Sequence, residues 1–165
     1  MLETALRLGG GHWSLLLGSL PFDSINLAGN GYTIRQIQGQ VHKALAYSPD
    51  VVVIMAGTND LLGDQYNEHK AVKELVSISR MFAQSSSLCV ITLPVKMRKI
   101  SASQAVQRLN DQLRVTLSGS DCTLLDLNPV LAPQGVLSDR FSADGVHLTH
   151  EAYAVWVDHL RPVLP

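Results

Sequence analysis

Asp144 and His147 are the pair of residues in this sequence best suited to acid–base chemistry. They stand three residues apart in a loop just before a helical pattern, so their side chains can be brought together. In such a pair the histidine would act as general base, and the aspartate would fix its tautomer and stabilise the imidazolium. The alternative is a surface turn built on Asp144 and Gly145 that carries an incidental histidine.

A second polar segment, Gly57–Asp60, directly follows an apolar run. Gly57 permits an unusual backbone conformation, and Asn59 would then present a neutral amide donor above the end of the run. Such a donor can stabilise an oxyanion, and its loss costs roughly 10²–10³ in rate. The alternative is an Asx turn in which the Asn and Asp side chains cap the next element.

A third segment, Asn26–Thr33, contains two glycines between a short apolar stretch and a helical pattern. Gly31 would present its backbone N–H close to a helix N-terminus, where developing negative charge is favoured. The alternative is a tight turn between a strand and a helix.

The elements that would position these segments alternate between strands and helices. Val51–Met55 is β-branched and uncharged, which is typical of a parallel strand buried on both faces. Apolar residues at helical spacing follow in 34–45, 72–82 and 106–117, and again after Thr149. This alternation predicts an α/β domain with a mainly parallel sheet, whose ligands bind beyond the carboxyl ends of the strands. The other predicted strands are Ser24–Leu27, Leu88–Leu93 and Thr123–Leu127.

Composition narrows the function further. A length of 165 residues suits a single domain, and a net charge of −1 gives no case for binding nucleic acid or an anionic membrane. No apolar run approaches the ~20 residues of a transmembrane segment. No signal peptide is visible, which favours the cytoplasm only weakly and leaves the compartment and the oligomeric state open. Cys89 and Cys122 are predicted to be small apolar core residues, and no spacing suggests a metal site.

Together, Gly31, Gly57–Asp60 and Asp144–His147 resemble the SGNH hydrolase superfamily, the GDSL-type esterases and lipases. The resemblance runs from about Trp13 to the end of the chain. It implies a three-layer α/β/α flavodoxin-like sandwich that hydrolyses a small carboxylic ester or an acetyl group and needs no cofactor or metal. It also implies that Gly31 and Asn59 supply oxyanion-hole donors, while Asp144 and His147 belong to a catalytic triad.

The sequence departs from the family at its first block, because no Gly-Asp-Ser occurs anywhere. In the family that block carries the nucleophilic serine and lies some tens of residues before the Gly31 turn. Ser14 and Ser19 lie in a helix-like stretch, and Ser24 leads directly into a strand. None of the three is expected to be the nucleophile.

The family's first strand, which is central in the sheet, is predicted to be missing as well. Met1–Leu8 favours helix or loop by composition, so residues 1–165 are interpreted as a single SGNH domain that is incomplete at its N-terminus. A start placed too late or a truncation would explain the gap. Without a central strand, the neighbouring strands would lack hydrogen-bond partners, and the isolated chain would be poorly stable.

The leading hypothesis is a serine-type ester hydrolase whose full-length form contains the missing serine. A second hypothesis is a non-catalytic relative that binds a ligand or a partner through the same cleft. A nucleotide- or phosphate-binding flavodoxin-like domain is less favoured, because no glycine-rich phosphate loop follows a strand. Lys96, Arg98 and Lys99 form a basic cluster that is either a solvated loop or a contact for an anionic head group. Candidates to line an acyl pocket, or else to pack in the core, are Leu61, Leu62, Tyr66, Leu93, Pro94, Val95 and Met97.

Overall fold

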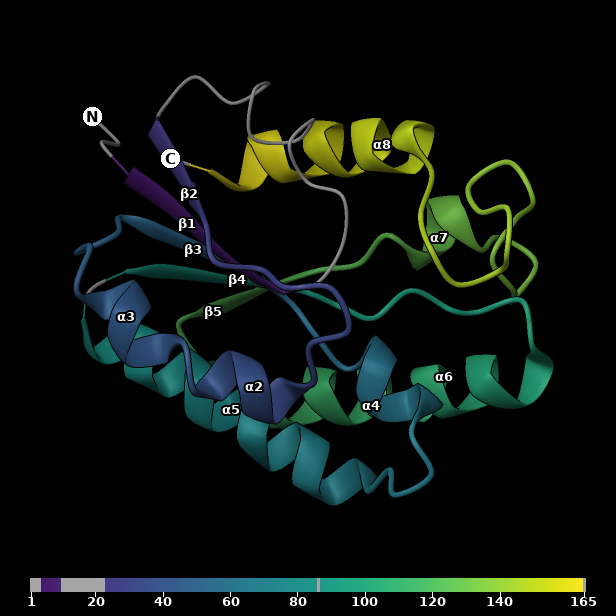
Figure 1. Cartoon of the computed structure of the whole chain (residues 1–165), viewed down its shortest axis with the longest axis horizontal. Helices are drawn as coiled ribbons and strands as arrows, with labels where there is room; N and C mark the ends of the chain where they lie inside the picture. The colour runs from purple at the N-terminus through teal and green to yellow at the C-terminus, as the bar shows by residue number, and fades with distance from the viewer. Residues whose placement is uncertain (1–3, 10–22, 86, 165) are drawn as a thin grey trace.

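A parallel sheet organises the fold in the computed structural model, which describes residues 4–9, 23–85 and 87–164. Its order is β2-β1-β3-β4-β5, and every neighbouring pair is parallel (Figure 1). The strands are β1 (Thr4–Gly9), β2 (Asp23–Asn26), β3 (Val51–Met55), β4 (Leu88–Thr92) and β5 (Cys122–Leu125). The four strands expected from the sequence are therefore confirmed, to within two residues at each end.

The prediction that the central strand is missing is wrong. Thr4–Gly9 forms β1, which pairs with β2 on one side and with β3 on the other. Leu6, for example, is in register with both Ile25 and Val52. Composition favoured helix or loop here, but a central position provides backbone partners on both sides, and tertiary context often overrides such a weak local preference. The instability expected from an open gap therefore has no basis in this sheet.

Helices cover both faces of the sheet, which gives three layers (Figure 1). On one face lie α2 (Ile34–Gln38), α3 (Val41–Leu45), α4 (Thr58–Leu62), α5 (Glu68–Gln84) and α6 (Ile100–Thr116). On the other lie α7 (Asn128–Leu131) and α8 (His150–Leu160), and the single turn η1 (Arg161–Val163) follows α8. The predicted α/β/α sandwich is confirmed. No helix in the described ranges has the length and apolar character needed to cross a membrane.

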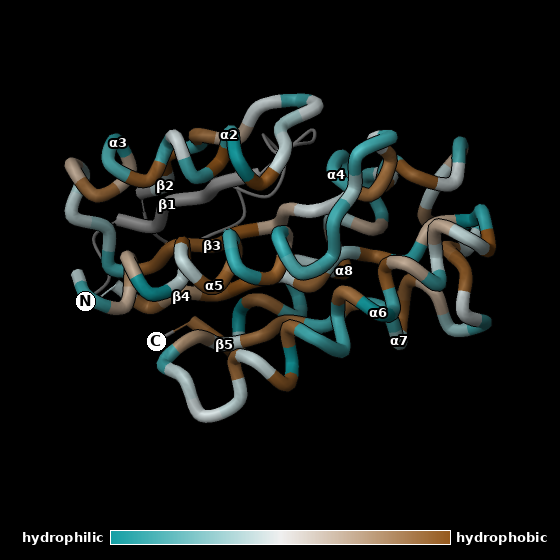
Figure 2. Tube along the Cα trace, turned by 90° about the horizontal axis from the view of Figure 1, so that it is seen from below, coloured by the Kyte–Doolittle hydropathy of each residue, from teal (hydrophilic) through white to brown (hydrophobic). Residues whose placement is uncertain are grey.

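Side-chain alternation along β3 divides the core in two. Val52 and Ile54 pack with the helices of the first face, whereas Val51 and Val53 pack with α7 and α8. Successive residues of a strand point to opposite faces, so a strand covered on both sides must be apolar throughout. In Figure 2, β3 and β4 are accordingly hydrophobic along their length, whereas α5 and α6 alternate in hydropathy.

Two other features differ in detail from the sequence-based predictions. The helix expected over 34–45 is divided into α2 and α3, because Gly39 ends α2 and glycine is a poor helix former. Cys89 is fully buried in the core, while Cys122 is half-buried against it, and their sulfur atoms lie 3.7 Å apart as free thiols. Both cysteines thus pack as the predicted small apolar residues.

Gly57 connects β3 to α4 with a φ of 109°, a backbone conformation that favours glycine. A Cβ atom there would lie 3.2 Å from Leu109 Cδ2 and 3.3 Å from Pro94 Cγ. We predict that Gly57→Ala lowers the free energy of unfolding by about 2–5 kcal/mol, since backbone strain and overpacking add. Urea denaturation measures this change.

Gly119→Ala is the matched control, because Gly119 also has a positive φ, of 74°, but has open space around the position of a Cβ. Its expected loss is about 1–2 kcal/mol from the backbone alone. Equal losses in the two variants would contradict the argument that close packing, as well as backbone conformation, requires glycine at position 57.

Candidate active site

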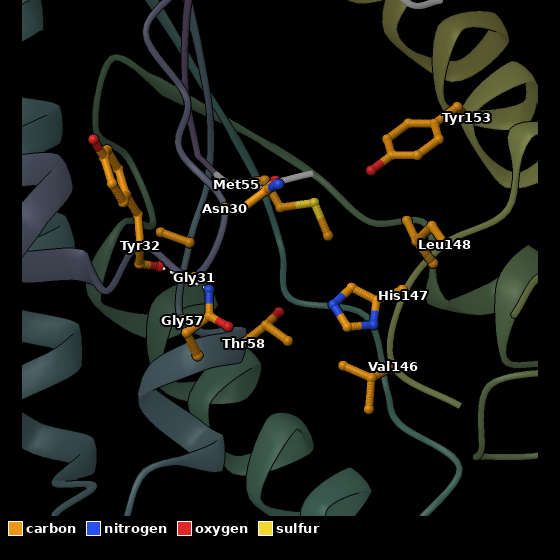
Figure 3. Close-up of a pocket in the computed structure, with 12 residues that line it drawn as sticks. Asn30, Gly31, Tyr32, Met55, Gly57, Thr58, Val146, His147, Leu148 and Tyr153 are labelled. Carbon is orange, nitrogen blue, oxygen red and sulfur yellow. Dashed lines mark hydrogen bonds between the residues drawn. The ribbon is translucent and has the colours of Figure 1, made fainter. Parts of the chain in front are cut away.

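Three loops from distant parts of the sequence meet at one pocket beyond the carboxyl ends of the strands. The pocket has a volume of about 230 Å³. Figure 3 shows His147 on one side of it, and Gly31, Gly57 and Thr58 on the other. The structure therefore brings the three predicted polar segments together. The described residues that line the pocket are Asn30, Gly31, Tyr32, Met55, Ala56, Gly57, Thr58, Asn59, Val146, His147, Leu148 and Tyr153.

Asp144 and His147 form a hydrogen-bonded pair within the loop before α8. His147 Nδ1 lies 2.6 Å from Asp144 Oδ2, and Asp144 Oδ1 accepts the backbone N–H groups of Val146 (2.9 Å) and His147 (2.8 Å). An ionised carboxylate only accepts hydrogen bonds, so the proton between the two side chains belongs to Nδ1. The other ring nitrogen, Nε2, is then left as an acceptor, which is the state that a general base requires.

The same contacts lower the pKa of Asp144 below its usual range. The main cause is the hydrogen bond from the His147 side chain, followed by the two backbone N–H groups. Because the pKa in the folded state is lowered, the stabilisation from these contacts is fully present above the unfolded-state pKa. It is lost as the pH falls through the folded-state pKa.

We therefore predict that the Asp144 side-chain ¹³C resonance titrates with a midpoint below about 3.9, the usual aspartate value. In the His147→Ala variant the midpoint should rise toward that value, because the largest cause of the lowered pKa is removed. NMR titration of the folded protein measures both midpoints. A midpoint in the unsubstituted protein at or above the usual value would show that the pair is not formed.

The Gly31 turn and the start of α4 are tied together by Asn59. Gly31 has a φ of 74°, and the Asn59 side chain donates from Nδ2 to the Tyr32 carbonyl at 2.9 Å. An amide nitrogen carries two hydrogens, so one remains for another acceptor. Both residues line the pocket, which fits the predicted role as oxyanion donors without testing it.

Asp60 adds a second tie between α4 and the same turn. Its Oδ2 accepts the backbone N–H of Ile34, at the start of α2, at 3.0 Å. Burial raises the pKa of this half-buried carboxyl, while the hydrogen bond from Ile34 acts in the opposite direction. Asn59 and Asp60 therefore fix the position of the Gly31 turn relative to α4.

The predicted lining of an acyl pocket does not match the pocket. None of the seven candidates is among the described residues that line it, and Leu93, Val95 and Met97 are instead buried in the protein core. The lining residues that the sequence analysis missed are Met55, Thr58, Leu148 and Tyr153. Three of these lie in or next to the polar motifs, so adjacency was an available signal. Tyr153 lies one turn into α8, and only the fold reveals its position.

None of the described residues that line the pocket is a serine. Ser24 lies near the amino end of β2, paired with Ala5, and is not among the lining residues. Ser14 and Ser19 lie outside the described residues. In the sequence, β1 is followed by Gly10, Gly11 and His12, without a hydroxyl-bearing residue.

The basic cluster after β4 is divided in its roles. Arg98 contacts the backbone of the loop that carries Asp144, whereas the backbone N–H of Lys96 donates to Asn128 Oδ1 at 2.8 Å. Arg98 is thus part of an internal contact rather than a freely solvated side chain. Over residues 4–9, 23–85 and 87–164, no group of three or more His, Cys, Asp or Glu residues could hold a metal ion.

A parallel α/β/α sandwich with an Asp–His pair at the carboxyl ends of its strands defines a hydrolase-like α/β domain. Comparison with known families makes this specific, since residues 5–155 match the GDSL-like Lipase/Acylhydrolase family. The chain belongs to this family, which confirms the resemblance inferred from its motifs. No curated protein sequence matches the chain.

Solved structures support the same fold. A GDSL-like lipase from Bacteroides thetaiotaomicron has a TM-score of 0.84 and 19% identity, over 98% of this chain and 87% of that chain. The lipase/acylhydrolase from Enterococcus faecalis has a TM-score of 0.80 and 17% identity, over 98% and 95%. An acetyl xylan esterase, AlAXEase, has a TM-score of 0.82 and 17% identity, over 98% and 100%. At these identities, the likeness shows the fold alone.

Proposed function

We propose that this protein hydrolyses small carboxylic esters by a serine-type mechanism. The observation that carries the proposal is the pairing of His147 with Asp144, at 2.6 Å, across one pocket from Gly31 and Asn59. Membership in a family of lipases and acylhydrolases supports it. One of the structural neighbours is an acetyl xylan esterase, which makes an acetyl ester a suitable first substrate to test.

In the proposed reaction, a serine hydroxyl attacks the ester carbonyl carbon while His147 Nε2 accepts the hydroxyl proton. The carbonyl oxygen becomes negative and would be bound by the Gly31 N–H and the free N–H of Asn59. The bond to the alcohol then breaks, and the alcohol leaves with the proton from His147. Water repeats the same steps on the acyl-serine and releases the carboxylic acid. Asp144 holds the imidazole throughout and stabilises its charged form.

The serine is the part of the proposal that the described residues do not provide at the pocket. We propose that it belongs to a Gly-Asp-Ser segment in a longer form of the protein. In that form, the strand that leads into Gly-Asp-Ser would take the central place that β1 occupies here, between β2 and β3.

A second candidate function is non-catalytic binding of an ester, carboxylate or partner in the same pocket. The sequence after β1 favours it, because Gly10, Gly11 and His12 follow this central strand where the family has its nucleophile block. In this case His147 would donate or accept a hydrogen bond to the bound ligand without proton transfer.

Fluorophosphonate labelling of the purified 165-residue chain, with the adduct located by peptide mass spectrometry, tests these proposals. We expect no adduct on the folded chain, and a single adduct at Gly-Asp-Ser in a longer form, which His147→Ala would abolish. An adduct within the 165 residues that depends on His147 would show that an internal residue is the nucleophile. Absence of labelling and of p-nitrophenyl acetate turnover in every form, with stoichiometric binding of the ester, would support the binding function instead.

A further inference from the structure

Arg98 spans the space between the segment after β4 and the loop that carries Asp144 and His147. Its Nη2 donates to the Ser142 carbonyl at 2.7 Å, and its Nη1 lies 3.2 Å from the Ala143 carbonyl. Its backbone N–H donates to the Gly145 carbonyl at 2.9 Å. One residue thus binds the backbone on both sides of Asp144.

The loop that Arg98 holds is otherwise exposed near its functional residues. The side chains of Asp144 and His147 are 55% and 83% exposed, so packing does little to fix them. Within the loop, Ser142 Oγ accepts the Gly145 N–H at 2.9 Å, and Phe141 accepts the Thr149 N–H at 2.9 Å. These bonds shape the loop internally, whereas Arg98 connects it to the segment that follows the sheet.

Close approach of the backbones supports a built contact. Gly145 has a φ of 83°, and a Cβ atom at this position would lie 2.5 Å from Arg98 Cβ. No larger residue could therefore occupy position 145 without moving Arg98. The Arg98 stem, its backbone N–H and its guanidinium group contact one continuous stretch, Ser142–Gly145.

We propose that Arg98 is a positioning residue for the Asp144–His147 pair, acting through the two-pronged contact of its guanidinium group with consecutive carbonyls. The inference deepens the proposed ester hydrolysis and rests on it for its functional meaning. A guanidinium group presents donors in a fixed planar fork, which orients two peptide groups at once, whereas an ammonium group is a point charge. Geometry, rather than charge, is therefore the property that matters at this position.

The ion pair of Arg98 with Asp139 is not expected to carry this role. Arg98 Nη2 lies 2.6 Å from Asp139 Oδ1, but the Asp139 side chain is 90% exposed. Exposed ion pairs contribute little to a fixed geometry because water screens them and both side chains must lose entropy. Asp139→Asn therefore serves as a matched control that alters the charge partner and leaves the carbonyl contacts in place.

The test measures ¹⁵N chemical shifts of the His147 ring, which report the fraction of neutral imidazole with its proton on Nδ1. We expect this fraction to fall by about two-fold or more in Arg98→Ala and in Arg98→Lys, toward the value in Asp144→Asn. It should be unchanged in Asp139→Asn and in Arg108→Ala, which removes an exposed arginine of α6. Thermal unfolding of each variant confirms that it is folded.

An unchanged Nδ1 fraction in folded Arg98→Lys or Arg98→Ala would overturn the proposal. Arg98→Lys keeps the charge and most of the stem, so it remains a test if Arg98→Ala does not fold. The readout needs no turnover. Failure of ester hydrolysis with an Arg98-dependent tautomer would therefore count against the proposed function alone.

Discussion

Replacement of His147 by alanine is expected to lower the kcat for ester hydrolysis by about 10⁴–10⁶-fold in the form of the protein that carries the serine. Without the imidazole, no described side chain that Asp144 orients remains to accept the hydroxyl proton or to return it to the leaving alcohol. Stability should change by about 0.5 kcal/mol or less, because the side chain is 83% exposed. Rates of p-nitrophenyl acetate hydrolysis and thermal unfolding measure the two effects.

His150→Ala is the control for this prediction. His150 begins α8 three residues further along the chain and is exposed, but it is not among the pocket-lining residues. It should leave kcat unchanged. A His147→Ala variant that keeps more than about a tenth of the kcat would mean that another group serves as general base, since removal of a true base is far more costly.

Asn59→Ala has the second-largest expected effect, a reduction of kcat by about 10²–10³-fold. The alanine variant loses the N–H proposed to bind the oxyanion, and it also loses the hydrogen bond to the Tyr32 carbonyl at 2.9 Å. The second loss frees the turn that presents the Gly31 N–H. The effect should appear in kcat rather than in KM, because the oxyanion exists only in the transition state and the intermediate.

Asn67→Ala provides a control with a comparable structural cost. Asn67 caps α5 by accepting the Lys70 N–H at 2.9 Å, and loss of such a cap costs about 1 kcal/mol. This variant should lower stability and leave kcat unchanged. If Asn59→Ala lowers stability to the same extent and also keeps its kcat, Asn59 only ties the turn to α4 and is not an oxyanion donor.

The parts of the fold that the sequence predicted well are those with a strong local pattern. Val51–Met55 is uninterrupted and β-branched, and only a strand buried on both faces accommodates such a run. β1 has no comparable pattern, because Thr4, Ala5 and Arg7 interrupt its leucines. Its central position depends on pairing with β2 and β3, which are distant in the sequence, so local propensity predicted it wrongly.

The same distinction applies to the site. Asp144 and His147 are three residues apart, so their contact could be predicted from spacing alone, and the structure confirms it at 2.6 Å. Arg98 precedes that loop by more than forty residues, and nothing in its own segment indicates what it binds. Tyr153 reaches the pocket for a reason that is equally invisible in the sequence, namely the direction of α8.

The measurement that tests the account most directly is the tautomer of His147, read from its ring ¹⁵N shifts at a pH where the ring is neutral. We predict that the proton lies on Nδ1, held by Asp144, and that Asp144→Asn shifts it substantially to Nε2. Either a proton mainly on Nε2 in the unsubstituted protein, or identical shifts in the two proteins, would contradict the account. His147 would then not be oriented as a general base.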